Sequence, residues 1–227
     1  MARTSARKPG GAAVRIEAHD RAYEIEATGI VGRCAAQGVP YEARLLEWIY
    51  EQKFSGLALD VGAHVGNHSL YMAAICALDV VAFEPTKNVR DLRRNVSLNE
   101  LEERITVHRV ALGREHAIGK MVGKGQVDPD WRSMTQELKL GDGELEIQTL
   151  DSFQLEDVAV IKVDVEGMEA DVLAGGLLTI ERDRPVIYAE TWGDDYTRSV
   201  GEVLAPLGYE VTNRIRTATP VQEWRCR

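Results

Sequence analysis

Two segments, LALDVGAHVGNHSL at 57–70 and VVAFEP at 80–85, constrain the fold of this chain more than any other feature. Each contains a short apolar strand that ends at an acidic residue, Asp60 in the first and Glu84 in the second. A glycine-containing turn and the predicted start of a helix lie between them. This order of strand, glycine turn, helix, strand and acid is typical of a unit that holds a nucleoside. The glycines let the backbone approach the ligand, and the second acid can accept both ribose hydroxyls.

The spacing of the turn indicates which nucleoside. A dinucleotide site has the pattern G-x-G-x-x-G, whereas this turn runs from Gly62 to Gly66 without a middle glycine, which disfavours a dehydrogenase. Asp60 lies two residues before Gly62, which fits a ligand with an amino-acid end, namely S-adenosylmethionine (SAM). We expect Asp60 near the methionine ammonium, directly or through water, and the backbone amides after Gly62 facing its carboxylate. An ordinary strand-to-helix turn is the alternative.

Composition limits the class of protein. The chain has 227 residues, enough for one α/β domain, and its net charge of −9 argues against a binder of the nucleic-acid backbone. No apolar run approaches the roughly 20 residues of a membrane helix, and no secretory signal is visible. Residues 1–13 are basic and small and are expected to form a disordered tail. Three widely spaced cysteines without a CxxC pair suggest neither disulfides nor a zinc site and favour a cytoplasmic setting.

The rest of the chain divides into an extension and a main domain. Residues 14–55 are expected to form the extension, with a small hairpin in 14–31 and an amphipathic helix over 41–53 that packs beside the domain and covers the cofactor. In 56–227 strands and helices alternate, which predicts a mostly parallel sheet with helices on both faces. The predicted strands are 57–61, 79–84, 105–110, 145–149, 159–164, 185–190, 208–213 and 221–225. The predicted helices are 67–77, 86–98, 168–181 (interrupted at Gly175-Gly176) and 194–206.

Residues 113–144 break this alternation. They are rich in glycine and contain Pro129 and Trp131. A segment of this length inside a compact domain is usually functional or mobile. We expect a substrate lid here, with a plain excursion between two strands as the alternative.

A second acidic cluster follows the strand at 159–164. Asp164 ends that strand, Glu166 follows it, and Glu190 ends the strand at 185–190. In an open parallel sheet ligands bind outside the carboxyl ends of the strands, so these acids should converge with Asp60 and Glu84. They are candidates for proton abstraction or for holding a divalent cation such as Mg²⁺. Glu169 is better explained as a helix cap.

Histidine supplies further candidates in the glycine turn. His64 could act as a general base because histidine titrates near neutral pH. For His68, just inside the helix, we expect a role in shaping the pocket.

Together these segments resemble the FkbM family of SAM-dependent methyltransferases over approximately residues 40–190. The matching stretches are LDVGAHVGNHSLY (59–71), AFEP (82–85), Asn95 with Asn99, VALG (110–113), TLDSF (149–153), IKVDVEGMEADVLAGG (161–176) and VIYAE (186–190). The resemblance implies a class I methyltransferase fold, which is Rossmann-like, with a seven-stranded sheet whose last strand is antiparallel. His64 departs from the family, which usually has asparagine at this position.

The leading interpretation is transfer of a methyl group from SAM to a hydroxyl of a small molecule such as a sugar or polyketide. The expected cofactor contacts are Asp60, Gly62, His64, Gly66, Asn67, Glu84, Pro85 and Ala111. The catalytic candidates are Asp164, Glu166, Glu190 and His64. An RNA ribose methyltransferase and a non-catalytic module that kept the fold remain alternatives. The oligomeric state stays open, with a homodimer as one option.

Overall fold

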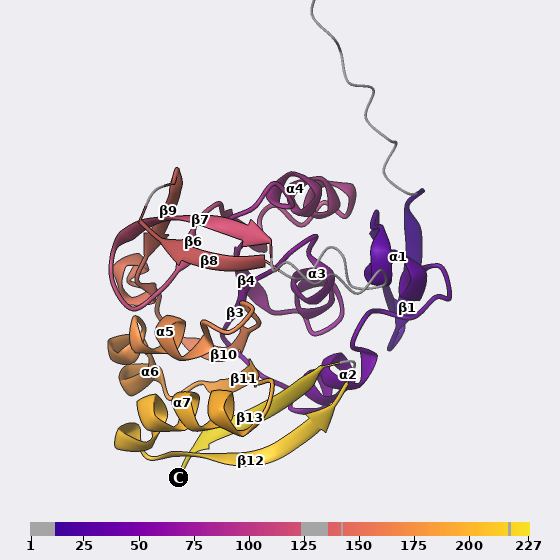
Figure 1. Ribbon diagram of the computed structural model, residues 1–227. Coiled ribbons are helices and arrows are strands. Elements are labelled where there is room, and N and C mark those ends of the chain that lie inside the picture. Colours follow the sequence, from indigo (N-terminus) through magenta and orange to yellow (C-terminus); the bar gives the residue numbers. More distant parts are fainter. Residues whose placement is uncertain (1–11, 124–135, 142, 218) are drawn as a thin grey trace, which may run out of the picture.

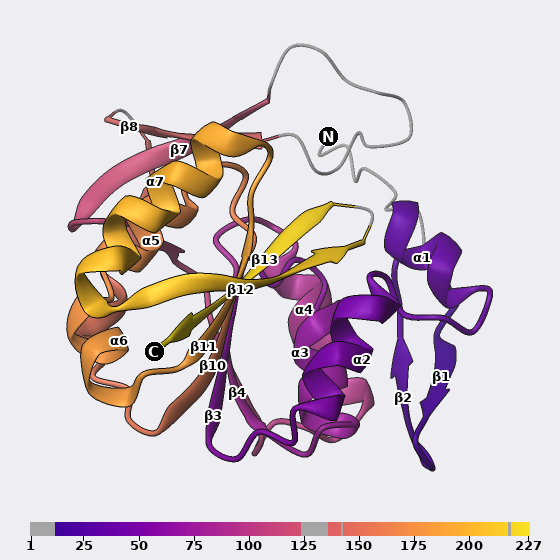
Figure 2. The same ribbon diagram turned by 90° about the horizontal axis from the view of Figure 1, so that it is seen from below.

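The computed structural model describes residues 12–123, 136–141, 143–217 and 219–227. The described part contains a central sheet between two layers of helices, a smaller second sheet, and an N-terminal hairpin at the outer side of one helix layer (Figures 1 and 2). None of the described helices is long and apolar enough to cross a membrane.

The central sheet has seven strands in the order β12-β13-β11-β10-β3-β4-β5 within the described residues. In chain order they are β3 (Leu57–Val61), β4 (Asp79–Phe83), β5 (Ile105–His108), β10 (Val158–Val163), β11 (Val186–Glu190), β12 (Tyr209–Arg216) and β13 (Pro220–Cys226). The strands from β5 to β11 run parallel, whereas β13 is antiparallel to both of its neighbours. The prediction of a seven-stranded, mostly parallel sheet with an antiparallel last strand is therefore confirmed.

Helices cover both faces of this sheet, as Figure 2 shows. The helices on one side are α2 (Ala43–Glu51), α3 (Asn67–Ala74) and α4 (Val89–Leu98), and those on the other are α5 (Glu169–Ala174), α6 (Leu177–Asp183) and α7 (Asp194–Leu204). Successive strand residues point to opposite faces, so Ala58 joins the core on the α3 side while Leu59 joins the core on the α5 side. Because both faces of these strands are buried, their sequences are almost continuously apolar.

The break between α5 and α6 falls at Gly175-Gly176, as expected from the sequence. A Cβ on Gly175 would lie 2.0 Å from the carbonyl oxygen of Gly113, so only glycine lets these two segments approach this closely. The contact brings the end of α5 against the chain at Gly113.

The N-terminal extension adds to the core on the α3 side. β1 (Val14–Ala18) and β2 (Arg21–Ile25) form the expected hairpin, and α1 (Gly29–Ala35), which the sequence reading missed, follows. Tyr23 and Ile25 are buried and share one apolar cluster with Leu45 of α2 and Leu70 of α3. The hairpin is therefore packed against the helix layer rather than against the sheet.

The described parts of 111–148 form a second sheet of four strands in the order β6-β9-β7-β8. Its strands are β6 (Ala111–Leu112), β7 (Ala117–Gly123), β8 (Gln136–Leu140) and β9 (Leu145–Gln148). The predicted strand at 145–149 therefore exists but lies outside the central sheet, because it pairs with β6 and β7. Residues 124–135, which include Trp131, lie outside the described residues, and the lid stays a prediction.

Candidate active site

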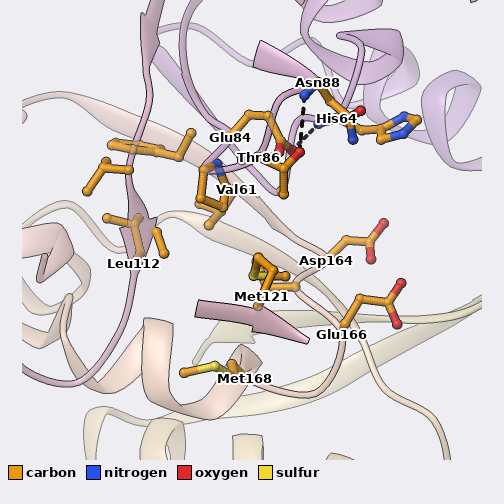
Figure 3. Close-up of a pocket in the computed structure, with 16 residues that line it drawn as sticks. Val61, His64, Glu84, Thr86, Asn88, Leu112, Met121, Asp164, Glu166 and Met168 are labelled. Atoms are coloured by element: carbon orange, nitrogen blue, oxygen red, sulfur yellow. Dashed lines mark hydrogen bonds between the residues drawn. The ribbon is translucent and has the colours of Figure 1, made fainter. Parts of the chain in front are cut away.

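A cavity lies at the carboxyl ends of β3, β4 and β10, where the sequence places the ligand (Figure 3). The space between its lining residues, including the solvent at its open mouth, is about 820 Å³. Val61 and Leu112 lie on one side, and Asp164, Glu166 and His64 lie on the other (Figure 3). The full lining is Val61, Gly62, His64, Phe83, Glu84, Pro85, Thr86, Asn88, Val110, Ala111, Leu112, Met121, Asp164, Val165, Glu166 and Met168.

The glycine turn borders the cavity at Gly62. This residue has φ +85°, and a Cβ on it would lie 1.9 Å from the carbonyl oxygen of Asp164. Only glycine therefore allows the turn after β3 to approach the end of β10. Gly66 also has a positive φ, but a Cβ there would meet the Leu92 side chain, so Gly66 serves helix packing and does not line the cavity.

The backbone amides of this turn are already hydrogen-bonded within the protein. The amide of Ala63 donates to the carbonyl of Phe83 at 3.1 Å, and that of Gly66 donates to the carbonyl of Ala63 at 2.8 Å. The amide of His64 donates to Glu84 Oε2 at 2.8 Å. The expectation that the amides of the turn face the cofactor carboxylate is not met for these three, because Phe83, Ala63 and Glu84 already accept them.

Glu84 joins the turn to the second strand. Its carboxylate is 4% exposed and accepts hydrogen bonds from the amides of His64 and Thr86, both at 2.8 Å (Figure 3). Burial raises the pKa of Glu84, and the two amide hydrogen bonds oppose that rise. Each carboxylate oxygen has a second lone pair, so Glu84 can hold the turn and still accept a hydroxyl from the cavity.

Besides Gly66, two other predicted cofactor residues do not line the cavity. Asp60 is fully buried and accepts a hydrogen bond from Ser69 Oγ at 2.5 Å. Asn67 is buried too, and its amide pairs with the backbone N–H and C=O of Tyr41. Both side chains point into the helix layer, and neither lines the cavity. Pro85 and Ala111, in contrast, line it as predicted.

Lys162 is the functional candidate that the sequence reading missed. It is almost fully buried on β10, and its Nζ lies 3.2 Å from Asp164 Oδ2 and 3.7 Å from Asp60 Oδ1. Burial opposes its charge, yet the two carboxylates raise the pKa of Lys162 above its ordinary value. A charged residue inside the apolar run VIKVD was the available signal, since lysine is rarely buried without a partner.

Asp164 and Glu190 form a hydrogen-bonded pair of acids beside this lysine. Burial and then the charge of Asp164 raise the pKa of Glu190 to about 10. Burial opposes the ionisation of Asp164, but Lys162 and a hydrogen bond from Glu190 lower the pKa of Asp164 to about 2. The pair thus holds one proton near neutral pH, on Glu190. Asp164 lines the cavity, whereas Glu190 lies behind it.

The histidines of the turn have separate environments. His64 lines the cavity with φ +52°, and burial lowers the pKa of its imidazole, which is therefore neutral near pH 7. His68 does not line the cavity, and its Nε2 lies 3.1 Å from Glu42 Oε2, just before α2. No residue of α2 belongs to the cavity lining, so that helix does not cover the cavity in the described structure.

The acids Asp164, Glu166 and Glu190 gain no support as the ligands of a metal ion. Among the residues that the structure describes, no three His, Cys, Asp or Glu side chains are placed so that they could hold a metal ion. The Lys162 ammonium already stands next to the Asp164 carboxylate, where a divalent ion would have to bind. Asp164, Glu166 and Glu190 are therefore better described as an acid group with its own buried cation.

The cavity fits the nucleoside part of SAM. Gly62 leaves room where a side chain would collide, and Glu84 presents an acid with spare acceptor capacity. Phe83, Val110 and Leu112 supply an apolar wall suited to a purine ring. The amino-acid end of SAM has no comparable partner in the cavity, because the Asp60 carboxylate is buried against Ser69.

A family model described as the methyltransferase FkbM domain matches residues 60–214. No curated protein sequence matches the chain. Among solved structures, the chain is similar to methyltransferase FkbM from Methylobacillus flagellatus KT, with 21% identity and a TM-score of 0.51 over 74% of this chain and 43% of that chain.

Two further solved structures share the fold. The Pyrococcus abyssi tRNA (uracil-54, C5)-methyltransferase, in complex with S-adenosyl-L-homocysteine, is 16% identical, with a TM-score of 0.52 over 93% of this chain and 44% of that one. A protein in the NADB-Rossmann superfamily from Streptococcus agalactiae is 14% identical, with a TM-score of 0.51 over 80% of this chain and 67% of that one. The chain spans less than half the length of the two methyltransferases.

Proposed function

This chain belongs to the FkbM methyltransferase family, and from that premise we propose that it transfers a methyl group from SAM to a hydroxyl oxygen of a small molecule. The observation that carries the proposal is the division of one cavity into two halves. Glu84 and the apolar wall form a nucleoside half, and Asp164, Glu166 and His64 form a polar half that opens beside it (Figure 3).

In the nucleoside half, Glu84 would accept the ribose hydroxyls while its amide hydrogen bonds keep the turn in place. Phe83, Val110 and Leu112 would surround the base. SAM, when bound, supplies an electrophilic methyl group on a sulfonium. The protein has to hold the acceptor oxygen in line with that methyl group, and alignment of this kind is worth up to about 7–11 kcal/mol of the barrier.

In the polar half, two groups can take the proton of the acceptor hydroxyl. Asp164 is ionised near neutral pH because Lys162 lies beside it, so it can accept a hydrogen bond from the hydroxyl and orient it. Neutral His64 can accept a proton as the new bond forms. A low pKa makes Asp164 a weak base, which favours orientation by Asp164 and proton acceptance by His64.

A small acceptor is supported by charge and by the site. The net charge of −9 and the acidic polar wall disfavour a nucleic-acid backbone at this mouth.

The test is methyl transfer from labelled SAM to a small-metabolite pool and, separately, to total RNA. We expect SAM to bind in calorimetry and label to appear in a small molecule. Label in RNA alone would replace the proposed acceptor class, and absence of SAM binding would leave a non-catalytic module.

Two variants then separate the proposed roles. Asp164→Asn should lower kcat while SAM affinity stays within about one order of magnitude, a shift of roughly 1.4 kcal/mol. His64→Gln should lower kcat and remove the acidic limb of its pH profile. Full turnover in both variants would contradict the assignment of the polar half.

A further inference from the structure

We propose that Asn95 is a positioning residue that fastens the cofactor-binding turn to the N-terminal hairpin, and so sets the affinity for SAM from outside the cavity. The inference rests on the proposed function, because it assumes that the turn after β3 holds the cofactor. Asn95 lies on α4, is fully buried, and does not line the cavity.

The Asn95 amide joins two segments that are far apart in the sequence. Its Nδ2 donates to the carbonyl of Val65 in the turn at 2.8 Å and to the carbonyl of Glu26, just after β2, at 3.0 Å. Its Oδ1 accepts from the amide of Glu26 at 2.8 Å. Both donor hydrogens and the acceptor are thus used, as a buried amide requires.

The turn needs this support from its outer side. His64 has φ +52° and Gly66 has φ +95°, so Val65 lies between two residues in the left-handed region. A residue other than glycine in that region is strained and keeps this conformation only where its surroundings hold it. Glu84 holds the cavity side of the turn through the His64 amide, and Asn95 holds the opposite side through the Val65 carbonyl.

Asn99, one helical turn further along the chain, provides an internal comparison. Its Oδ1 accepts from the amide of Glu24 at 2.6 Å, and its Nδ2 donates to the carbonyl of Glu24 at 2.7 Å. Asn99 thus makes the same paired contact with the hairpin, but its remaining hydrogen bond goes to the carbonyl of Asn95 rather than to the turn. Asn99 anchors the hairpin, and Asn95 anchors the hairpin and the turn together.

An ion pair also holds Glu26, the hairpin partner of Asn95. Arg94 Nη1 lies 3.1 Å from Glu26 Oε2, next to the Asn95 contact. The hairpin, Val14–Ala18 with Arg21–Ile25, precedes the residues 60–214 that match the family model. The extension therefore acts as an outer support for the cofactor-binding turn.

The experiment compares Asn95→Ala with two controls on the same helix, Asn99→Ala and Val96→Ala. Val96 is buried in the apolar cluster of the helix layer and has no side-chain hydrogen-bonding group, so its truncation lowers stability but leaves the hydrogen bonds of the turn in place. For each variant, SAM affinity is measured by calorimetry, the midpoint of thermal unfolding is measured without ligand, and hydrogen exchange is followed at the His64 and Gly66 amides.

We expect Asn95→Ala to weaken SAM binding by about tenfold or more and to speed exchange at both amides, while the controls stay within about threefold of the unsubstituted protein. If Asn95→Ala does not fold, Asn95→Ser, which keeps a hydroxyl at the buried position, is measured in its place. Equal loss of affinity in Asn95→Ala and in Val96→Ala would overturn the proposal, since general destabilisation would then explain it. Absence of SAM binding by the unsubstituted protein would instead refute the proposed function.

Discussion

Lys162 Nζ lies 3.2 Å from Asp164 Oδ2, directly behind the polar wall of the cavity. Lys162 is also the register partner of Asp60 on the neighbouring parallel strand, and its Nζ lies 3.7 Å from that carboxylate. One buried cation therefore serves both a carboxylate that lines the cavity and one that bonds to Ser69 of α3. Removal of one partner from such a group leaves uncompensated buried charge, which costs more than the pair itself contributes.

The first prediction follows for Lys162→Met. Methionine has a similar volume but leaves Asp60 and Asp164 without their cation, so the free energy of unfolding should fall by about 3–5 kcal/mol. Urea titration followed by circular dichroism measures this loss. Lys120→Met, at an exposed lysine on β7, is the control and should change stability by at most about 0.5 kcal/mol. Equal losses in the two variants would show that the Lys162 contacts do not stabilise the fold.

The second prediction concerns pH and Glu190. Its pKa rises to about 10 through burial and through the charge of Asp164, whereas a glutamate in the unfolded chain titrates near about 4.3. Between these values the folded state keeps a proton that the unfolded state has released. The free energy of unfolding should therefore fall as pH rises, by at most about 1.4 kcal/mol per pH unit. Asp164 has the opposite effect on the free energy of unfolding. Its pKa is lowered in the folded state, so it reduces stability only as pH falls below about 4.

Urea titrations from about pH 6 to 9 check this slope. Glu190→Gln keeps the shape and a donor toward Asp164 but cannot titrate, so its stability should be nearly independent of pH in that range. An unchanged slope in Glu190→Gln would place the titrating group elsewhere.

The sequence predicted those features that depend on local pattern. Strand-end acids, the glycine turn and alternating elements gave the sheet and the place of the cavity, and Gly62, Glu84 and Asp164 line it as expected. The burial of the Asp60 and Asn67 side chains away from the cavity could not be predicted from the local pattern. Both are polar residues at the expected positions, and only the tertiary neighbours Ser69 and Tyr41 show that their hydrogen-bonding groups are used inside the fold.

Strand pairing was also beyond the local pattern. β9 has the length and composition of a strand of the central sheet, yet it pairs with β6 and β7 in a second sheet. Alternation of apolar residues identifies a strand but does not name its neighbour. Lys162 was missed for a related reason, because its two carboxylate partners come from different strand ends.

The third prediction is that Glu84→Gln weakens SAM binding. A charge-assisted hydrogen bond contributes about 1.5–3 kcal/mol, so the dissociation constant should rise by roughly one to two orders of magnitude. Calorimetry measures it, and thermal unfolding shows whether the loss of the amide hydrogen bonds also loosens the turn. Asp91→Asn, a half-exposed acid on α4 that does not line the cavity, is the control. Unchanged affinity in Glu84→Gln would remove Glu84 from the cofactor site.

The last prediction compares two glycines with similar backbone angles. Gly62 has φ +85° and Gly38 has φ +74°, but a Cβ on Gly62 would lie 1.9 Å from the Asp164 carbonyl, whereas a Cβ on Gly38 meets nothing within 4 Å. Gly38→Ala should therefore cost only the left-handed strain, about 1–2 kcal/mol, and leave SAM affinity unchanged. Gly62→Ala should cost more stability, because the turn and the end of β10 must separate, and it should weaken SAM binding at the same time. Urea titration and calorimetry on both variants decide the matter: equal stability losses with equal affinities would mean that the close approach at Gly62 does not shape the cavity.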